Sequence, residues 1–205
     1  MTDAIRNALA LFAARGFDVR IFDTAAQLRA AVLAAVPDGC TAGFGGSVTC
    51  QRALALPEGL EEKDCTVYSH WRTPAIQDPD IFRKENSADV FFTSCNAITL
   101  DGKLMNNDGF GNRLSGICYG PGEVFFLAGT NKFVRDYAAG MERIYHVAYP
   151  KNVQRLHADA PCARVGVCLH CGKKQCETSG LTLVVTHPVE GRPMHLWVAD
   201  ESLGF

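Results

Sequence analysis

The chain has 205 residues, of which 47% are hydrophobic and 20% charged, as in an ordinary globular protein large enough to bury a full core. Its formal net charge is -2 and it has no lysine- or arginine-rich run. This charge pattern gives no electrostatic basis for binding nucleic acid or an anionic membrane surface.

The N-terminal segment predicts an amphipathic helix, because Ile5, Leu9 and Phe12 recur on one helical face. Charged residues interrupt its apolar run and no small-residue cleavage site follows, so we expect no signal peptide. Apolar runs elsewhere, such as residues 124–129, are too short to span a bilayer. We therefore expect a cytoplasmic protein without a membrane partner.

Helical and strand patterns then alternate along the chain. The first part of the chain predicts a strand at 17–22, a helix at 24–37, a strand at 40–44, a helix at 47–54, a strand at 65–68 and a helix or turn at 80–87. The middle predicts strands at 90–94 and 104–106, a helix at 111–118, a strand at 123–128 and a helix at 134–148 that Pro150 ends. The last predicted elements are two strands at 181–186 and 195–199, which form a hairpin or an adjacent pair. The run 90–94 is almost continuously apolar, which is typical of a parallel strand buried on both faces. We predict one α/β domain over residues 1–205, with an open, mainly parallel sheet covered by helices on both faces.

A glycine-rich turn joins the predicted strand 40–44 to the predicted helix 47–54. Gly45 and Gly46 allow a ligand to approach the backbone closely, and Ser47 and Thr49 supply hydroxyl groups. With free amide groups and the positive end of a helix, such a turn can bind phosphate, carboxylate or pyrophosphate. A tight connection with Ser47 as an ordinary helix cap is the alternative. The turn matches neither the nicotinamide and flavin fingerprint nor a P-loop.

Polar residues crowd after the buried strand 90–94, where open α/β sheets bind ligands. An ordinary turn would not need so many amide and carboxylate groups, so we predict a binding site, with simple turn chemistry as the alternative. Lys132 and Asn131 follow the next buried strand, and Lys132 is either a ligand-binding cation or a surface residue. Asp101, Asp108 and Lys132 are the candidate catalytic groups. The binding residues predicted after strand 90–94 are Asn96, Thr99, Asp101, Asn107, Asp108, Gly109, Gly111, Asn112 and Arg113.

Nine cysteines are present, and four of them fall within fifteen residues, in a loop at 161–177. The spacing of Cys162, Cys168, Cys171 and Cys176 is C-x5-C-x2-C-x4-C, and its two-residue chelate occurs in both zinc and iron–sulfur sites. Two disulfides are the alternative, which a reducing compartment disfavours. We predict one metal centre at these four residues. The other five cysteines are expected to be small core residues.

Several motifs together resemble one known family, the LUD domain of bacterial lactate-utilisation proteins. They are GFGGSVT, SCNAITLDGKLMNNDGFGNR, AGTNKFV, the four cysteines and the closing ESLGF. The resemblance covers residues 43–205 and corresponds to the stand-alone form with extra cysteines. It implies a protein that binds a small anionic metabolite or cofactor, in redox or organic-acid metabolism, and its redox setting favours an iron–sulfur cluster over zinc.

The same resemblance implies a fold similar to that of ribose-5-phosphate isomerase, coenzyme A transferases and 5-formyltetrahydrofolate cyclo-ligase. Some of those isomerases place a catalytic Asp where this chain has Asn96, and an amide is not a general acid or base. Three functions therefore stay open: an anion-binding lactate-utilisation protein, an enzyme acting on a phosphorylated sugar or folate-like substrate, and a non-catalytic electron-transfer or scaffold subunit. Redox partner proteins and a homo-oligomer are compatible with these.

Overall fold

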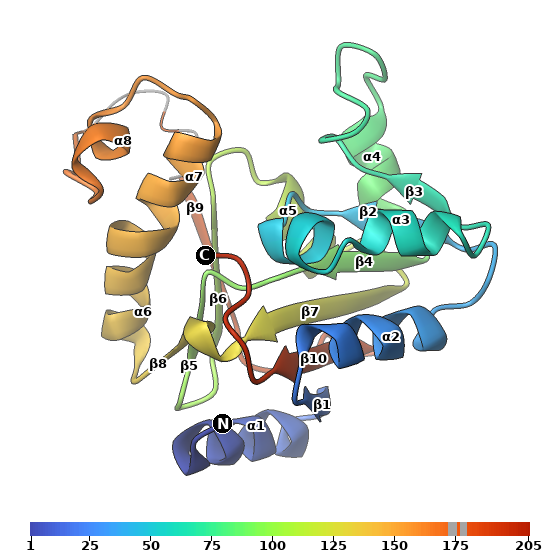
Figure 1. The fold of residues 1–205 in the computed structure, drawn as a ribbon, viewed down its shortest axis with the longest axis horizontal. Coiled ribbons are helices and arrows are strands. Elements are labelled where there is room, and N and C mark those ends of the chain that lie inside the picture. The colour runs from blue at the N-terminus through green and yellow to red at the C-terminus, as the bar shows by residue number, and fades with distance from the viewer. Residues whose placement is uncertain (172–175, 177–179) are drawn as a thin grey trace.

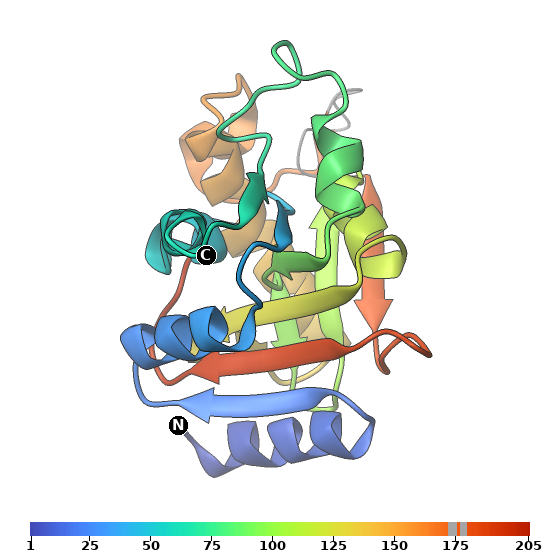
Figure 2. The same ribbon diagram turned by 90° about the vertical axis from the view of Figure 1, so that its right-hand side faces the viewer.

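The computed structural model describes residues 1–171, 176 and 180–205 (Figure 1). In this part of the chain, six parallel strands form one sheet in the order β1-β10-β7-β4-β2-β3. Figure 2 shows β1, β10 and β7 side by side and running the same way. The strands are β1 (Asp18–Phe22), β2 (Thr41–Phe44), β3 (Thr66–Tyr68), β4 (Val90–Thr93), β7 (Glu123–Gly129) and β10 (Met194–Ala199).

Helices cover both faces of this sheet, which confirms the predicted open, mainly parallel α/β architecture. One face carries α2 (Ala25–Ala35), the π-helix η1 (Thr49–Ala53) and α3 (Leu56–Glu61), and the other carries α1 (Asp3–Ala14) and α5 (Asn112–Cys118). The helix α4 (Ile81–Asn86) packs against β2 and the edge strand β3. Among the described residues, no helix combines the length and the apolar character that crossing a membrane requires.

The apolar runs of the central strands alternate between two hydrophobic cores. Phe92, Phe125 and Trp197 face α2, η1 and α3, whereas the neighbouring Phe91 and Phe126 face α1 and α5. Successive side chains of a strand point to opposite faces, so a strand buried on both faces needs a continuous apolar sequence. This requirement explains why the run at 90–94 identifies a central strand.

A second, smaller sheet packs beside the first, with strand order β8-β5-β6-β9. An arm of helices stands beside it in Figure 1. The strands are β5 (Ala97–Thr99), β6 (Leu104–Asp108), β8 (Phe133–Val134) and β9 (Leu181–Val185), and the arm consists of the short 3-10 helix η2 (Thr130–Lys132), α6 (Tyr137–Arg143), the π-helix η3 (Ile144–Ala148), α7 (Tyr149–Arg155) and α8 (Pro161–Val165).

Three predicted elements differ from the structure. The last two strands form no hairpin, because β9 pairs antiparallel with β6 while β10 lies between β1 and β7 in the other sheet. Pro150 does not end the helical segment, since it lies in the first turn of α7, where a missing N–H costs little. The predicted helix at 47–54 is reduced to the five-residue π-helix η1.

Gly43 allows an unusually close approach of α4 to the sheet. A Cβ atom at this position of β2 would lie 2.0 Å from the backbone carbonyl oxygen of Glu85 in α4. Because the obstacle is backbone, no side-chain rotation can relieve the clash. Gly43 therefore fixes where α4 lies, and with it the position of the Glu85 side chain.

We expect Gly43→Ala to lower the free energy of unfolding by about 1–3 kcal/mol or more, the usual cost of overpacking, since α4 has to move away from β2. Urea denaturation followed by circular dichroism measures this. Gly59→Ala in α3 is the matched control, because its Cβ would meet only the side chains of Arg29 and Leu33 and alanine favours helix. Equal stability of the two variants would contradict the assigned role of Gly43.

Candidate functional site

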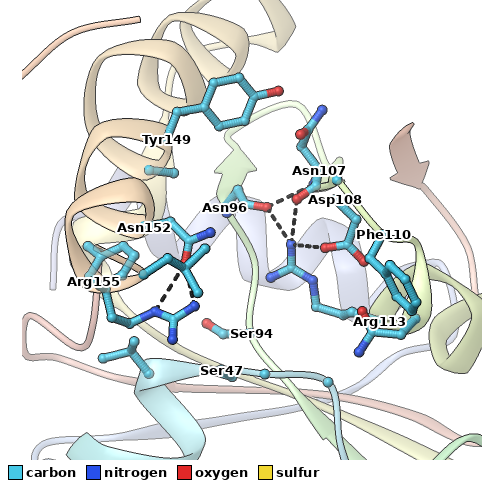
Figure 3. A pocket seen from close by; sticks show the side chains of 18 of the residues that line it. Ser47, Ser94, Asn96, Asn107, Asp108, Phe110, Arg113, Tyr149, Asn152 and Arg155 are labelled. Atoms are coloured by element: carbon cyan, nitrogen blue, oxygen red, sulfur yellow. Dashed lines mark hydrogen bonds and ion pairs between the residues drawn. The ribbon is translucent and has the colours of Figure 1, made fainter. Parts of the chain in front are cut away.

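A cavity of about 930 Å³ opens at the carboxyl ends of β2, β4 and β7, between the sheet, β6 and α7 (Figure 3). Parallel strands end at one edge of a sheet, and this edge is where such folds bind ligands. Most of the predicted binding residues line this one cavity. They are Gly45, Gly46, Ser47, Thr49, Asn96, Asn107, Asp108, Gly109, Asn112, Arg113 and Lys132.

Thr99 and Asp101 lie elsewhere, and the expectation that Asp101 faces the cavity is wrong. Residues 97–99 form β5 of the second sheet, which leads the chain away from the cavity toward α1. Asp101 is in the turn after β5, where it pairs with Lys103 and accepts a hydrogen bond from Thr99. The Arg15 side chain of α1 bonds the backbone of this same turn. Asp101 is therefore not a catalytic candidate for this cavity.

Gly111 and Asn131 support the cavity without lining it. Gly111 has φ +91° at the start of α5, a left-handed conformation that favours glycine. The Asn131 side-chain oxygen accepts from the Leu203 amide at 3.0 Å and holds the C-terminal segment against β7. Both residues are therefore structural in this fold.

Arg113 is the centre of the polar side of the cavity, as Figure 3 shows. Its Nη2 atom donates to Asn96 Oδ1 at 3.0 Å, to the Asn107 carbonyl at 2.7 Å and to Asp108 Oδ1 at 2.8 Å. Asp108 also accepts from the Leu114 amide at 3.2 Å. The side chains of Arg113 and Asp108 are each 12% exposed, so they neutralise one another in a poorly solvated place. Asp108 therefore neutralises Arg113 and not another cation of the cavity.

Lys132 is buried at the floor of the cavity, and its side chain is only 1% exposed. Its ammonium group donates to the carbonyl oxygen of Phe205. Within the described chain, no aspartate or glutamate forms an ion pair with it. Burial, followed by the positive charges of Arg143 and Arg113, lowers the pKa of Lys132 to about 7. Among the described residues, its hydrogen-bond partner is thus a main-chain oxygen and not an acidic side chain.

The glycine-rich turn forms another side of the floor. Gly46 has φ +72°, and a Cβ atom on it would lie 3.2 Å from Cε1 and Nε2 of His70. The backbone conformation thus requires glycine for folding, independently of any ligand. Because η1 is a five-residue π-helix, the helix dipole expected to attract an anion contributes little here. The hydroxyl of Ser47 faces the cavity and accepts from the Cys50 amide at 3.2 Å.

His70 and Glu85 form a pair that no sequence pattern indicates. Glu85 is fully buried in α4, and its Oε1 atom lies 2.7 Å from His70 Nδ1 and also accepts from the His70 amide. The Glu85 carboxylate is hydrogen-bonded to Nδ1 of His70. The other ring nitrogen, Nε2, is therefore the one that faces the glycine-rich turn. His70 follows β3 and Glu85 comes fifteen residues later in α4, so only the tertiary fold brings them together.

Sequence reasoning also missed an aromatic wall and the contribution of α7. His70, Phe82 and Phe110 line the cavity with ring centroids 5.1 Å and 5.0 Å apart, and Phe110 is 74% exposed. From the other side, α7 contributes Asn152 and Arg155. The segment 149–155 contains Pro150, at which we expected a helix to end, so the sequence did not indicate this part of the cavity lining.

Several lining residues carry a buried polar atom that has no hydrogen-bond partner within the described chain. Buried polar atoms in native proteins are nearly always paired, so such atoms in a cavity indicate groups available to a ligand or water. Cys95 also lines the cavity, and burial raises its pKa to about 12, so it is a neutral thiol rather than a nucleophile. The unpaired atoms are Ser94 Oγ, Asn107 Oδ1, Asn112 Nδ2 and Arg113 Nε.

The predicted cysteine loop lies partly outside the described residues. Burial raises the pKa of Cys162, and the nearby thiols of Cys168, Cys176 and Cys171 raise it further, so the four sulfur groups are neighbours. Cys162, Cys168 and Cys171 are free thiols, and Cys176 lines the cavity. Among the described residues, no three Cys, His, Asp or Glu side chains are placed so that they could hold a metal ion. The donor chemistry fits a thiophilic metal, whereas a preformed ligand geometry is not present in that part of the chain.

The sheet, its switch of strand order and the helices on both faces define an α/β protein of the open, doubly covered class, with a cavity at the carboxyl edge of the sheet. The LUD domain family model matches residues 5–191, and the chain belongs to this family. A DUF162 family protein from Deinococcus radiodurans has a similar fold, with a TM-score of 0.52 and 13% identity over 96% of each chain. No curated protein sequence matches the chain significantly.

Proposed function

We propose that this LUD-domain protein binds a small anionic metabolite or cofactor in the cavity, in redox or organic-acid metabolism. The observation that carries the proposal is Lys132, a buried cation in the cavity lining that has no aspartate or glutamate partner in the described chain. The family membership supports the general class of function, since the family is associated with lactate utilisation.

The energetic argument rests on the cost of burying charge. Removing an ammonium group from water costs several kcal/mol unless an opposite charge compensates it. Asp108 cannot compensate Lys132, because Arg113 already occupies it. A bound carboxylate or phosphate would supply the missing charge and would also meet Ser47 and the unpaired Ser94 hydroxyl. A bound anion would offset the cost of burying the Lys132 charge, and this gain in free energy would contribute to its affinity.

We expect anion affinity to fall as the pH rises through about 7, since Lys132 is charged below its pKa of about 7 and neutral above it. Well above that pH the loss should approach tenfold per pH unit. L-lactate is a suitable probe because its carboxylate keeps its charge over this range, and ribose 5-phosphate, AMP and 5-formyltetrahydrofolate complete the panel. Isothermal titration calorimetry measures the dissociation constants.

Lys132→Met should lower the affinity of any probe that binds by about tenfold or more at pH 6 and should abolish the pH dependence. Lys103→Met is the matched control, since Lys103 pairs with Asp101 outside the cavity. Thermal unfolding verifies that both variants are folded. Binding by the Lys132 variant with wild-type affinity at every pH would contradict the proposal.

A second candidate function is acid–base catalysis on a phosphorylated sugar or folate-like substrate. We infer it from the His70–Glu85 pair, which supplies the proton-transfer group that Asn96 cannot. A buried carboxylate that orients a cavity-facing imidazole is a frequent arrangement for a general base. His70 would accept or return a proton at Nε2, while Lys132 would hold the substrate anion.

For this candidate, His70→Gln should lower the rate of substrate conversion by a factor of about 10²–10⁴, the usual contribution of a general base, while changing ligand affinity little. Conversion of ribose 5-phosphate is followed by NMR. His146→Gln is the control, because His146 pairs with Glu142 on an exposed helix surface. Anion binding without any conversion by the wild type would leave the binding function and exclude ribose 5-phosphate isomerisation.

We further propose that Cys162, Cys168, Cys171 and Cys176 bind one metal centre. Support comes from their spacing and from the proximity of Cys162 to the other three sulfur atoms. A zinc ion would be structural, whereas a [4Fe–4S] cluster would supply electron transfer and suit a subunit that works with redox partner proteins. The family context favours the iron–sulfur cluster.

Anaerobic purification followed by metal and sulfide analysis should give a brown protein that absorbs near ~400 nm. Cys168→Ala together with Cys171→Ala should abolish metal binding, because the two-residue chelate is lost. Cys118→Ala, which removes an exposed cysteine outside the loop, is the control. One zinc per colourless chain would correct the metal, and four free thiols without bound metal would refute the site.

A further inference from the structure

Two arginines from distant segments meet on one tryptophan at the mouth of the cavity. The Arg155 guanidinium of α7 lies 4.4 Å from the centre of the Trp71 ring, and that of Arg52 in η1 lies 5.5 Å from it. Trp71 follows β3, and both Trp71 and Arg155 line the cavity. We call Arg52 and Arg155 the arginine pair.

The arginine pair has no acidic partner among the described residues, in contrast to Arg72 and Arg113. Arg155 donates from Nε and Nη2 to Asn152 Oδ1 at 3.1 Å and 2.8 Å, which is a neutral acceptor. In the part of the chain that the structure describes, no carboxylate forms an ion pair with Arg52 or Arg155. Arg72, by contrast, forms a two-bond pair with Glu61 although it directly follows Trp71.

The structure also holds the two like charges close to each other. Burial lowers the pKa of Arg155, and the positive charge of Arg52 lowers it further. Stacking on Trp71 restricts both guanidinium groups and partly offsets their repulsion. A guanidinium group without a carboxylate partner can bind carboxylate or phosphate with two parallel hydrogen bonds, and a second cation nearby favours the same anion.

The cavity is also larger than one small anion requires. Its volume of about 930 Å³ lies in the range of sites for ligands the size of a cofactor or drug. Lys132 lines it just after β7, and Arg155 lines it from α7. The lining residues that the structure describes include one acidic side chain, Asp108, which pairs with Arg113. Two separate positive sites thus share one cavity.

We propose that the ligand of this cavity carries two anionic groups, one bound at Lys132 and the other at the arginine pair. The inference rests on the proposed anion-binding function and narrows it to dicarboxylates, phosphorylated acids and similar dianions. A small acid with a single carboxylate would fill only the Lys132 end. The arginine pair would then determine specificity, and Lys132 would contribute to binding of mono- and dianions alike.

The test compares probes that differ only in the second anionic group. Malonate, succinate, glutarate and adipate are each titrated against the monocarboxylate of the same length, and 3-phosphoglycerate against glycerol 3-phosphate. Calorimetry gives the affinities, and tryptophan fluorescence reports on Trp71, since the other tryptophan, Trp197, is fully buried in the core. At least one dianion should bind about tenfold tighter than its partner and change the Trp71 emission.

Arg52→Met combined with Arg155→Met should remove this dianion advantage while leaving the monoanion affinity within about twofold. Arg155→Lys, which keeps the charge, should retain part of the advantage, and it remains informative if the double variant fails to fold. Arg72→Met is the control and should behave as wild type. Lys132→Met should weaken both members of each probe pair.

Equal affinity of every dianion and its monoanion partner would overturn the inference and leave the proposed function intact. A dianion advantage that survives in the folded double variant would overturn it as well. Absence of binding by all probes, mono- and dianionic, would refute the anion-binding function and the inference together. The two failures are therefore distinguishable in one set of titrations.

Discussion

Parallel pairing of β4 with both β2 and β7 is the constraint on which the cavity depends. Three strands that run the same way deliver residues 45–47, 94–96 and 130–132 to one edge of the sheet, although these segments lie far apart in sequence. The second sheet then extends the site, since Asn96 accepts from the Asn107 amide at 2.8 Å. Any change in the register of β4 would separate Ser94 and Asn96 from the glycine-rich turn.

One cation that lines the cavity has an acidic partner, whereas two others have none among the described residues. Asp108 neutralises Arg113, whose Nη2 atom donates to Asp108, Asn96 and the Asn107 carbonyl. Lys132 donates to a main-chain oxygen of Phe205 and Arg155 to the Asn152 side-chain oxygen, and neither has an aspartate or glutamate partner among the described residues. A fold selected for stability alone would replace such cations with apolar residues, because breaking or omitting a buried ion pair costs about 3–5 kcal/mol. Their presence at one cavity is therefore better explained by a ligand that completes the charge balance.

The sheet and the polar side of the cavity could be predicted from the sequence because both depend on local patterns. The run at 90–94 identified a buried strand, and the polar residues behind it identified the side chains at its carboxyl end. Asp101 was misplaced because nothing in the local pattern shows that 97–99 turns into a second sheet. The pairing of His70 with Glu85 depends on how closely α4 approaches Gly43, which is a tertiary distance.

The cysteine loop and the cavity are neighbours, and this links the two sites physically. Cys176 lines the cavity, while Cys168 is tied to the arm through a 3.0 Å bond from its amide to the Tyr145 carbonyl. Bonds to a shared metal would fix the position of Cys176 at this wall, because a metal centre holds its ligands at set distances. Where anion binding depends on that position, the two binding events are coupled, and the coupling free energy is the same in both directions. The anion affinity with and without the proposed metal would therefore measure this coupling, whichever metal the thiols bind.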